Sequence, residues 1–277
     1  AALGAEFVFS DDKDSDVKGF PLKDIRNAAE LPPVSNVAEL LFINDLEKQY
    51  VEIVRKYPDF RIIPPFFWDI SGRATIHGII TTSMKFIGQD IFTMMMSEPE
   101  LVKDIHKWIA DVYIAVIKRF SALGRLPVTM VHIGECSGSM LDEFSYREFV
   151  TLYLGMLGRE FGAVRLHSCG NSDHIMNAIC EIENLKIIDS GSNTSLELIR
   201  KKMGRDFEIN VFPPVEVLSE GSKEEDIHEW LERTVRDNDG GNLKIAYHLE
   251  PDYNLSNCIF IHEELDRLGL VRKSRIY

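Results

Sequence analysis

The stretch Ala163–Asp189, AVRLHSCGNSDHIMNAICEIENLKIID, decides the fold of this chain. It begins with a short apolar run, Ala163–His167, and ends with another, Leu185–Asp189. Both runs are typical of strands buried in a parallel sheet. Between them, a Gly-Asn turn leads into Ser172–Ile182, whose apolar residues have the spacing of a helix. A strand, a helix and a second strand joined by short loops predict a βαβ unit.

The same pattern recurs over the rest of the chain. The other candidate strands are Ala5–Phe9, Phe60–Phe67, Val128–Ile133, Glu208–Phe212 and Leu243–His248. Capped amphipathic helix patterns follow several of them, with starts near Ser97, Thr194 and Ser222. We therefore expect the α/β class and a (β/α)8 TIM barrel, formed by a single domain over residues 1–277.

The number of candidate strands is smaller than a full barrel requires. Seven candidate strands are one short of a full barrel, and the chain begins with Ala1 rather than Met. The prediction is therefore a barrel that lacks its N-terminal segment. A doubly wound open sheet is the structural alternative, but no G-x-G-x-x-G loop follows any candidate strand.

Charge and cysteine content exclude several classes of protein. The 31 Lys and Arg residues stand against 44 Asp and Glu, which gives a net charge of −13 and argues against binding to nucleic acid. No apolar run approaches the roughly 20 residues of a membrane span, so we expect no membrane insertion. Four cysteines without a C-x-x-C pair predict a reducing compartment, the cytoplasm.

Residues with metal-binding or acid–base chemistry follow several strands. In a barrel, the side chains at the C-terminal ends of the strands meet at one mouth. His167 and Cys169, at the end of one strand, offer an imidazole and a thiolate, which both suit zinc. A buried histidine beside an inert core cysteine is the alternative. His248, at the end of the last candidate strand, is the predicted third ligand.

Other residues at strand ends have less specific patterns. Glu135 and Asp189 are predicted as a further ligand, a partner of an imidazole or a substrate contact, against the alternative of a solvated or capping acid. Asp69 and Arg73 suit an anionic substrate, or pair with each other. Tyr247 faces either the pocket or the opposite side of its strand. The structural residues are predicted to be Cys136, Cys180 and Cys258, and His77 is placed in a helix.

The chain also resembles a known family. His167-Ser168-Cys169-Gly170-Asn171 closely matches an H-x-C-G-N motif, and Gly72–Glu100, Gly134–Val150 and Tyr247–Asp252 contribute further similarity. Together these stretches resemble the uroporphyrinogen decarboxylase superfamily, closest to its zinc-dependent methylcobamide:coenzyme M type methyltransferases. The resemblance implies zinc on His167 and Cys169, with His248 standing where those methyltransferases have a second cysteine.

The implied function is transfer of a methyl group from a methyl-corrinoid to a thiol acceptor. The partners would be a small corrinoid protein and a small thiol substrate, with Glu135 and Asp189 as catalytic residues; a homodimer is a further expectation. One alternative is a cofactor-free decarboxylase of an acidic substrate that uses Asp69, Arg73 and Asp189. Another is a non-catalytic barrel that binds a corrinoid or tetrapyrrole.

Overall fold

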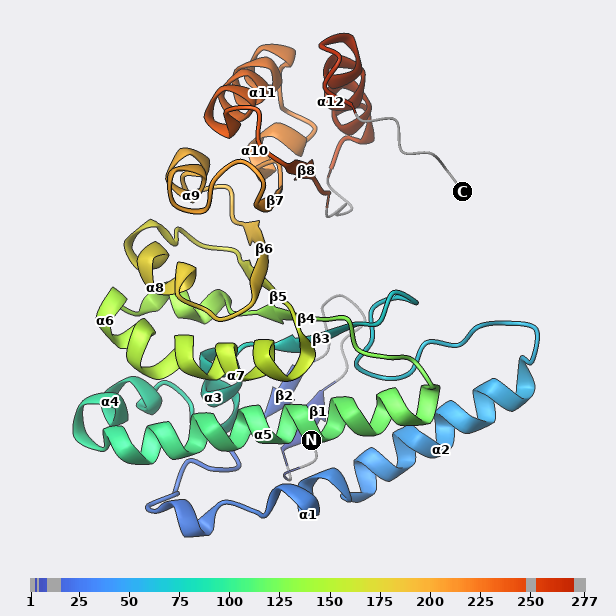
Figure 1. Cartoon of the computed structure of the whole chain (residues 1–277), viewed down its shortest axis with the longest axis vertical. Coiled ribbons are helices and arrows are strands. Elements are labelled where there is room, and N and C mark those ends of the chain that lie inside the picture. The colour runs from blue at the N-terminus through green and yellow to red at the C-terminus, as the bar shows by residue number, and fades with distance from the viewer. Residues whose placement is uncertain (1–2, 4, 9–15, 248–252, 272–277) are drawn as a thin grey trace. The chain divides into compact units, whose positions relative to one another are not determined.

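Six parallel strands alternate with helices along the chain (Figure 1). The computed structural model describes residues 3, 5–8, 16–247 and 253–271. The strands form one sheet in the order β3-β4-β5-β6-β7-β8. Their bounds are β3 Arg73–His77, β4 Met130–Gly134, β5 Val164–Ser168, β6 Leu185–Ser190, β7 Glu208–Val211 and β8 Leu243–Ile245. The predicted α/β class is confirmed, and the order of the strands follows their order in the chain, as in a (β/α)8 barrel.

Two of the predicted strands lie elsewhere or do not form. Ala5–Phe9 overlaps β1 (Glu6–Val8), which pairs antiparallel with β2 (Asp16–Lys18) in a separate two-stranded sheet. Phe60–Phe67 was wrong as a strand: it forms only an isolated bridge at Phe67. Two adjacent prolines in this segment have no N–H to donate to a neighbouring strand, so they oppose regular pairing.

Proline, serine and glycine residues mark the ends of some of the helices. α5 starts with a proline at its first position, and α9 starts after Ser195, whose side chain accepts a hydrogen bond from Leu198 N at 3.1 Å. α9 ends at Met203 and is followed by Gly204, which has a φ of 79°. No described helix is both long enough and apolar enough to cross a bilayer. The helices are α1 Val34–Ala38, α2 Leu41–Lys56, α3 Ile79–Ile87, α4 Asp90–Ser97, α5 Pro99–Gly124, α6 Glu143–Tyr146, α7 Leu152–Phe161, α8 Met176–Cys180, α9 Leu196–Met203, α10 Val215–Leu218, α11 Glu224–Asn238 and α12 Leu255–Arg267.

Side chains of β3, β4 and β5 alternate between two faces. One face is apolar and buried, and consists of Ala74, Ile76, Val131, Ile133, Val164 and Leu166. The residues between them therefore point to the other face, and many of these are polar. At the C-terminal ends of the strands, His77 is in register with Gly134, and Gly134 is in register with His167.

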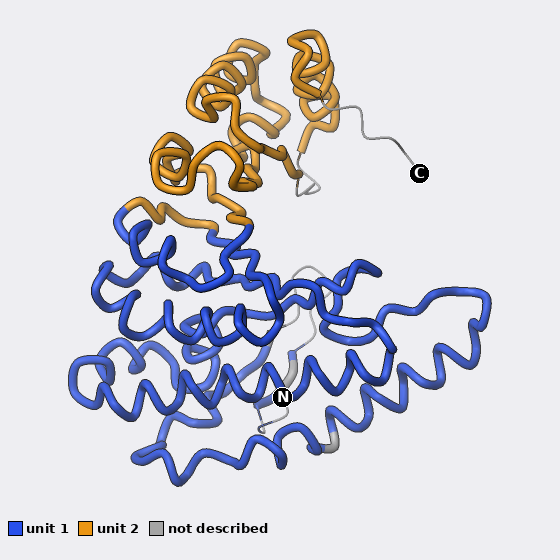
Figure 2. Tube along the Cα trace, viewed as in Figure 1, with its two compact units in different colours: residues 1–168, 174–186 blue, residues 169–173, 187–277 orange. Residues whose placement is uncertain are grey.

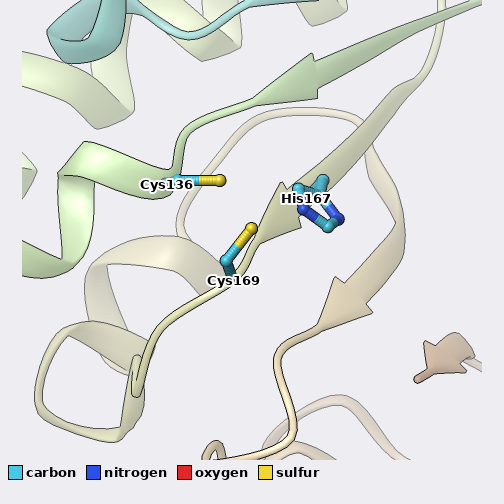
Figure 3. Close-up of side chains that lie close together, drawn as sticks. All are labelled: Cys136, His167 and Cys169. Carbon is cyan, nitrogen blue, oxygen red and sulfur yellow. The ribbon is translucent and has the colours of Figure 1, made fainter. Parts of the chain in front are cut away.

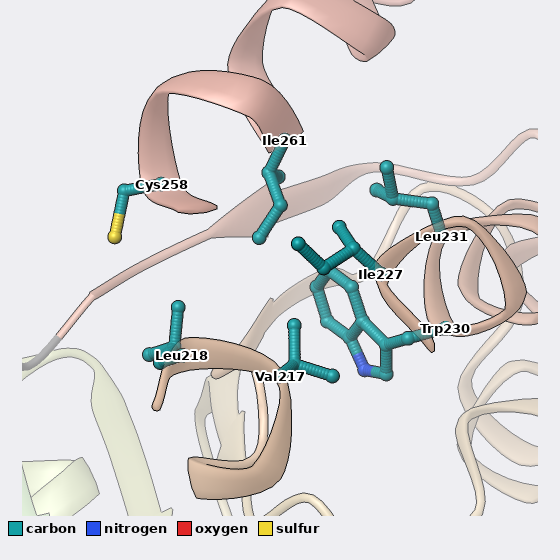
Figure 4. Close-up of a cluster of buried hydrophobic side chains, with 7 residues drawn as sticks. All are labelled: Val217, Leu218, Ile227, Trp230, Leu231, Cys258 and Ile261. Atoms are coloured by element: carbon teal, nitrogen blue, oxygen red, sulfur yellow. The ribbon is translucent and has the colours of Figure 1, made fainter. Parts of the chain in front are cut away.

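The chain divides into two compact units (Figure 2). The first consists of Ala1–Ser168 and His174–Lys186, and the second of Cys169–Asp173 and Ile187–Tyr277. Each has buried clusters of its own. In the first unit, one cluster joins α2 to α5 and consists of Ile43, Val116 and Phe120. In the second, α10, α11 and α12 contribute Val217, Leu218, Ile227, Trp230, Leu231, Cys258 and Ile261 (Figure 4). The packing role predicted for Cys258 is confirmed.

Candidate metal centre

Two cysteines and a histidine meet beyond the ends of β4 and β5. Cys136 lies just beyond β4, His167 is the penultimate residue of β5, and Cys169 directly follows that strand. The two Sγ atoms and one imidazole nitrogen all lie within 4.8 Å of one another. Figure 3 shows the two sulfur atoms directed toward each other, with His167 beside them on the tip of its strand. We call Cys136, His167 and Cys169 the Cys-His-Cys group.

Strand register explains why these residues converge. Gly134 of β4 is in register with His167 of β5. Cys136 lies two residues after Gly134, and Cys169 lies two residues after His167. The two cysteines therefore follow the same registered pair of residues by the same number of positions. The backbone N–H of Glu135 donates to the carbonyl of His167 at 2.9 Å, which fixes the two strand ends together just before the cysteines. The loop that carries Cys169 also needs Gly191, where a Cβ would lie 2.2 Å from the Cys169 carbonyl oxygen.

The donor set fits zinc. With a Zn–S distance of about 2.3 Å and tetrahedral geometry, two thiolates on one zinc ion lie about 3.8 Å apart. The observed limit of 4.8 Å is therefore within a small side-chain adjustment of ligation. Cys169 is exposed, and the other two residues are half-buried, so a fourth ligand can approach from solvent. Cys136, predicted as structural, belongs to this group, whereas the predicted ligand His248 lies outside the described residues.

Glu135 anchors the start of α3. Its buried carboxylate accepts hydrogen bonds from Ile80 N at 3.2 Å, from Thr81 N at 3.1 Å and from the Thr81 hydroxyl at 3.2 Å. These donors belong to the first turn of the helix, where backbone N–H groups lack partners within the helix. Burial nevertheless raises the pKa of Glu135 to about 7. The capping role that the sequence left open is therefore observed, and any catalytic role stays a prediction.

Asp189 lies near the end of β6, as predicted. Its carboxylate is buried and accepts a hydrogen bond from the side-chain amide of Asn210, at 2.6 Å on β7. The two residues are paired in register across the strands. This hydrogen bond satisfies one carboxylate oxygen and fixes the side chain against the neighbouring strand. Its predicted role toward a metal or substrate stays a prediction.

Asp69 and Arg73 lie away from the Cys-His-Cys group. Arg73 begins β3, so it is at the N-terminal end of a parallel strand whose C-terminal end is level with His167. The Arg73 guanidinium contacts the Asp69 carboxylate at 2.8 Å and lies over the Trp68 ring. The two residues therefore pair with each other, which was one of the two alternatives, and they are not brought together with Glu135 or His167.

Tyr247 and His77 are not members of the Cys-His-Cys group. Tyr247 follows β8 and packs against the hydrophobic cluster of the second unit, where burial raises its pKa to about 12. Its side chain thus packs against the cluster that α10, α11 and α12 form. His77, which the sequence placed in a helix, is instead the last residue of β3. It shares a face of the sheet with His167 and is exposed at the strand end.

Comparison with known proteins identifies the family of this α/β fold with a Cys-His-Cys group at its strand ends. Residues 71–243, more than half of the chain, match the family model of uroporphyrinogen decarboxylase (URO-D). The chain belongs to the URO-D family. No curated protein matches it in sequence.

A solved structure has the same fold. A methyltransferase from Methanosarcina mazei superposes with a TM-score of 0.69 and 14% sequence identity, over 97% of this chain and 77% of the other. At this level of identity the similarity establishes a shared architecture. The chain is therefore a member of an enzyme superfamily, with a fold that is also found in a methyltransferase.

Proposed function

We propose that this protein is a zinc-dependent methyltransferase that transfers a methyl group from a methyl-corrinoid, carried by a small partner protein, to a thiol. The observation that carries the proposal is the Cys-His-Cys group at the ends of β4 and β5. The family membership and the fold shared with a methyltransferase support the same reaction class.

The Cys-His-Cys group and Glu135 would have different roles in this reaction. Cys136, His167 and Cys169 would hold zinc, and zinc, when bound, would stabilise an acceptor thiol as its thiolate at a fourth position. Two thiolates and a neutral imidazole would bring the site to zero net charge. Glu135 holds the β4 end against α3, which keeps the adjacent Cys136 in position. Exposure of Cys169 leaves the group open to an incoming ligand.

Metal content tests the ligand set. Purified protein should contain about one zinc per chain, and Cys136→Ser, Cys169→Ser and His167→Ala should each lose most of it. Cys180→Ser is the matched control, because Cys180 lies in α8 and outside the group; its zinc content should be unchanged. Full zinc retention in all three ligand variants would refute the site.

Demethylation of methylcobalamin in the presence of thiols tests the reaction. The wild-type protein should demethylate it, and the three zinc-deficient variants should lose at least about 100-fold in rate, because losing even an outer-shell partner of a ligand costs about 10–100-fold. Activity that survives complete removal of zinc by a chelator would contradict the proposal. Corrinoid binding without any demethylation would instead identify a binding protein.

A further inference from the structure

Beside the Cys-His-Cys group the sheet has no side chain at Gly134, and a Cβ there would meet only one atom within 4 Å; we call the space above Gly134 the opening. His77, Gly134 and His167 form one row across β3, β4 and β5, because the first two are in register and so are the last two. The side chains of His77 and His167 point away from the buried apolar face, which is occupied by the neighbours Ile76, Ile133 and Leu166. Gly134 has no side chain, so the strand between the two histidines presents only backbone at this level.

Nothing in the described part of the fold requires glycine at position 134. A Cβ there would meet only the carbonyl oxygen of Ile76, at 3.9 Å, which is an ordinary contact. The backbone of Gly134 is also outside the left-handed region. Two neighbouring glycines differ: a Cβ at Gly78 would lie 2.2 Å from the Glu135 carboxylate, and one at Gly138 would lie 2.6 Å from the Tyr146 ring. Packing explains those two glycines and does not explain Gly134.

The spacing of the strands sets the width of the opening. Neighbouring strands are about 4.8 Å apart, so the Cα atoms of His77 and His167 are about 10 Å apart, with Gly134 midway. On one side the opening borders His167, a member of the Cys-His-Cys group. On the other side His77 is exposed at the strand end, and an imidazole can both donate and accept hydrogen bonds. A ligand held by the metal group would have its organic part above Gly134.

We propose that the organic part of the acceptor thiol occupies this opening, that Gly134 limits its size and that His77 forms its far wall and hydrogen-bonds to it. This inference rests on the proposed function, because it assumes that a thiol binds at the Cys-His-Cys group. Gly134 and His77 are then substrate-contacting residues that determine specificity and do not hold the metal.

Substitutions at Gly134 test the size limit. Cobalt(II)-substituted Gly134→Ala and Gly134→Val proteins are titrated with 2-mercaptoethanol and with the bulkier N-acetylcysteine, and binding is followed in the visible spectrum of the metal. Gly134→Val should weaken both thiols at least tenfold, whereas Gly134→Ala should weaken N-acetylcysteine more than 2-mercaptoethanol. Metal content should stay at the wild-type level. Gly221→Ala is the matched control, since a Cβ there meets nothing within 4 Å.

Substitutions at His77 test the wall. His77→Ala should weaken thiol binding about tenfold and raise KM more than it lowers kcat, and His77→Gln, which keeps hydrogen-bonding capacity, should recover most of the affinity. The control is His228→Gln on α11, in the second unit. Wild-type thiol affinity in both Gly134→Val and His77→Ala would overturn the inference, as would loss of metal from either variant.

The same titration separates the two proposals. If the metal-loaded wild-type protein binds neither thiol, the proposed function fails, and the inference fails with it. If the wild-type protein binds thiols and demethylates methylcobalamin while Gly134→Val behaves identically, the inference alone is wrong.

Discussion

Glu135 is expected to make the metal-free protein less stable as the pH rises toward neutrality. Burial raises the pKa of this carboxyl from 4.5 to about 7, so the folded protein keeps a proton that the unfolded chain has already lost. The stabilisation that the protonated Glu135 carboxyl gives the folded protein is complete below about pH 4.5 and is lost as the pH rises through 7. The free energy of unfolding should fall by up to about 3 kcal/mol over that interval.

Urea unfolding at several pH values measures this effect. Glu135→Gln keeps the size of the side chain and an acceptor oxygen but cannot ionise, so the wild type should lose stability relative to this variant between pH 4.5 and 8. Glu220→Gln replaces an exposed acid and serves as the control. A difference between wild type and Glu135→Gln that stays constant with pH would show that the carboxyl ionises normally.

The Cys-His-Cys group was only partly predictable from its residues. His167 and Cys169 form a local pattern that can be recognised in the sequence, whereas Cys136 has no second cysteine within four residues on either side. The signal that would have found it is positional, because Cys136 and Cys169 are each two residues past a registered pair on adjacent strands. That register is a tertiary property, set by how β4 and β5 pair, and it requires the exact ends of both strands.

At the level of elements, the start of α3 depends on a close approach between Gly78 and Glu135. Gly78 has a φ of −71°, which any residue adopts, so backbone strain does not require glycine there. A Cβ would instead lie 2.2 Å from the carboxylate oxygen and displace it from the N–H groups of Ile80 and Thr81. Gly78→Ala should therefore lower the free energy of unfolding by about 2–3 kcal/mol.

A double-mutant cycle identifies the cause of that loss. If displacement of the carboxylate is responsible, Gly78→Ala and Glu135→Gln should be non-additive, because both act on the same contact. Gly221→Ala should leave the urea midpoint unchanged. A Gly78→Ala protein as stable as the wild type would mean that the carboxylate moves aside at no cost.

The elements also show where periodicity fails as a predictor. Five of the seven predicted strands correspond to β4–β8, because each has a run of apolar residues, which is buried on at least one face in β4–β7 and half-buried in β8. β3 was missed, since only Ala74 and Ile76 are apolar in Arg-Ala-Thr-Ile-His and the opposite face is polar. A strand was predicted instead at 60–67, because of its aromatic and apolar residues, although the two prolines in this segment argue against a strand.

At the scale of the whole molecule, the two compact units are expected to lose structure separately. Ile261 is fully buried in the cluster of the second unit, and Phe120 is fully buried in a cluster of the first. Replacing either with alanine leaves a cavity that costs about 3 kcal/mol. Ile261→Ala should accelerate hydrogen exchange in α10–α12 and leave α5 protected, and Phe120→Ala should do the reverse. Equal acceleration in both units from either substitution would show that the chain unfolds as one cooperative body.

The chain order of the Cys-His-Cys group has a consequence for biosynthesis. All three residues lie between positions 136 and 169, more than 100 residues before the end of the chain. A nascent chain therefore exposes every member of the group before β8, at Leu243–Ile245, has been translated. If the group binds zinc, loading can therefore begin before synthesis of the chain is complete.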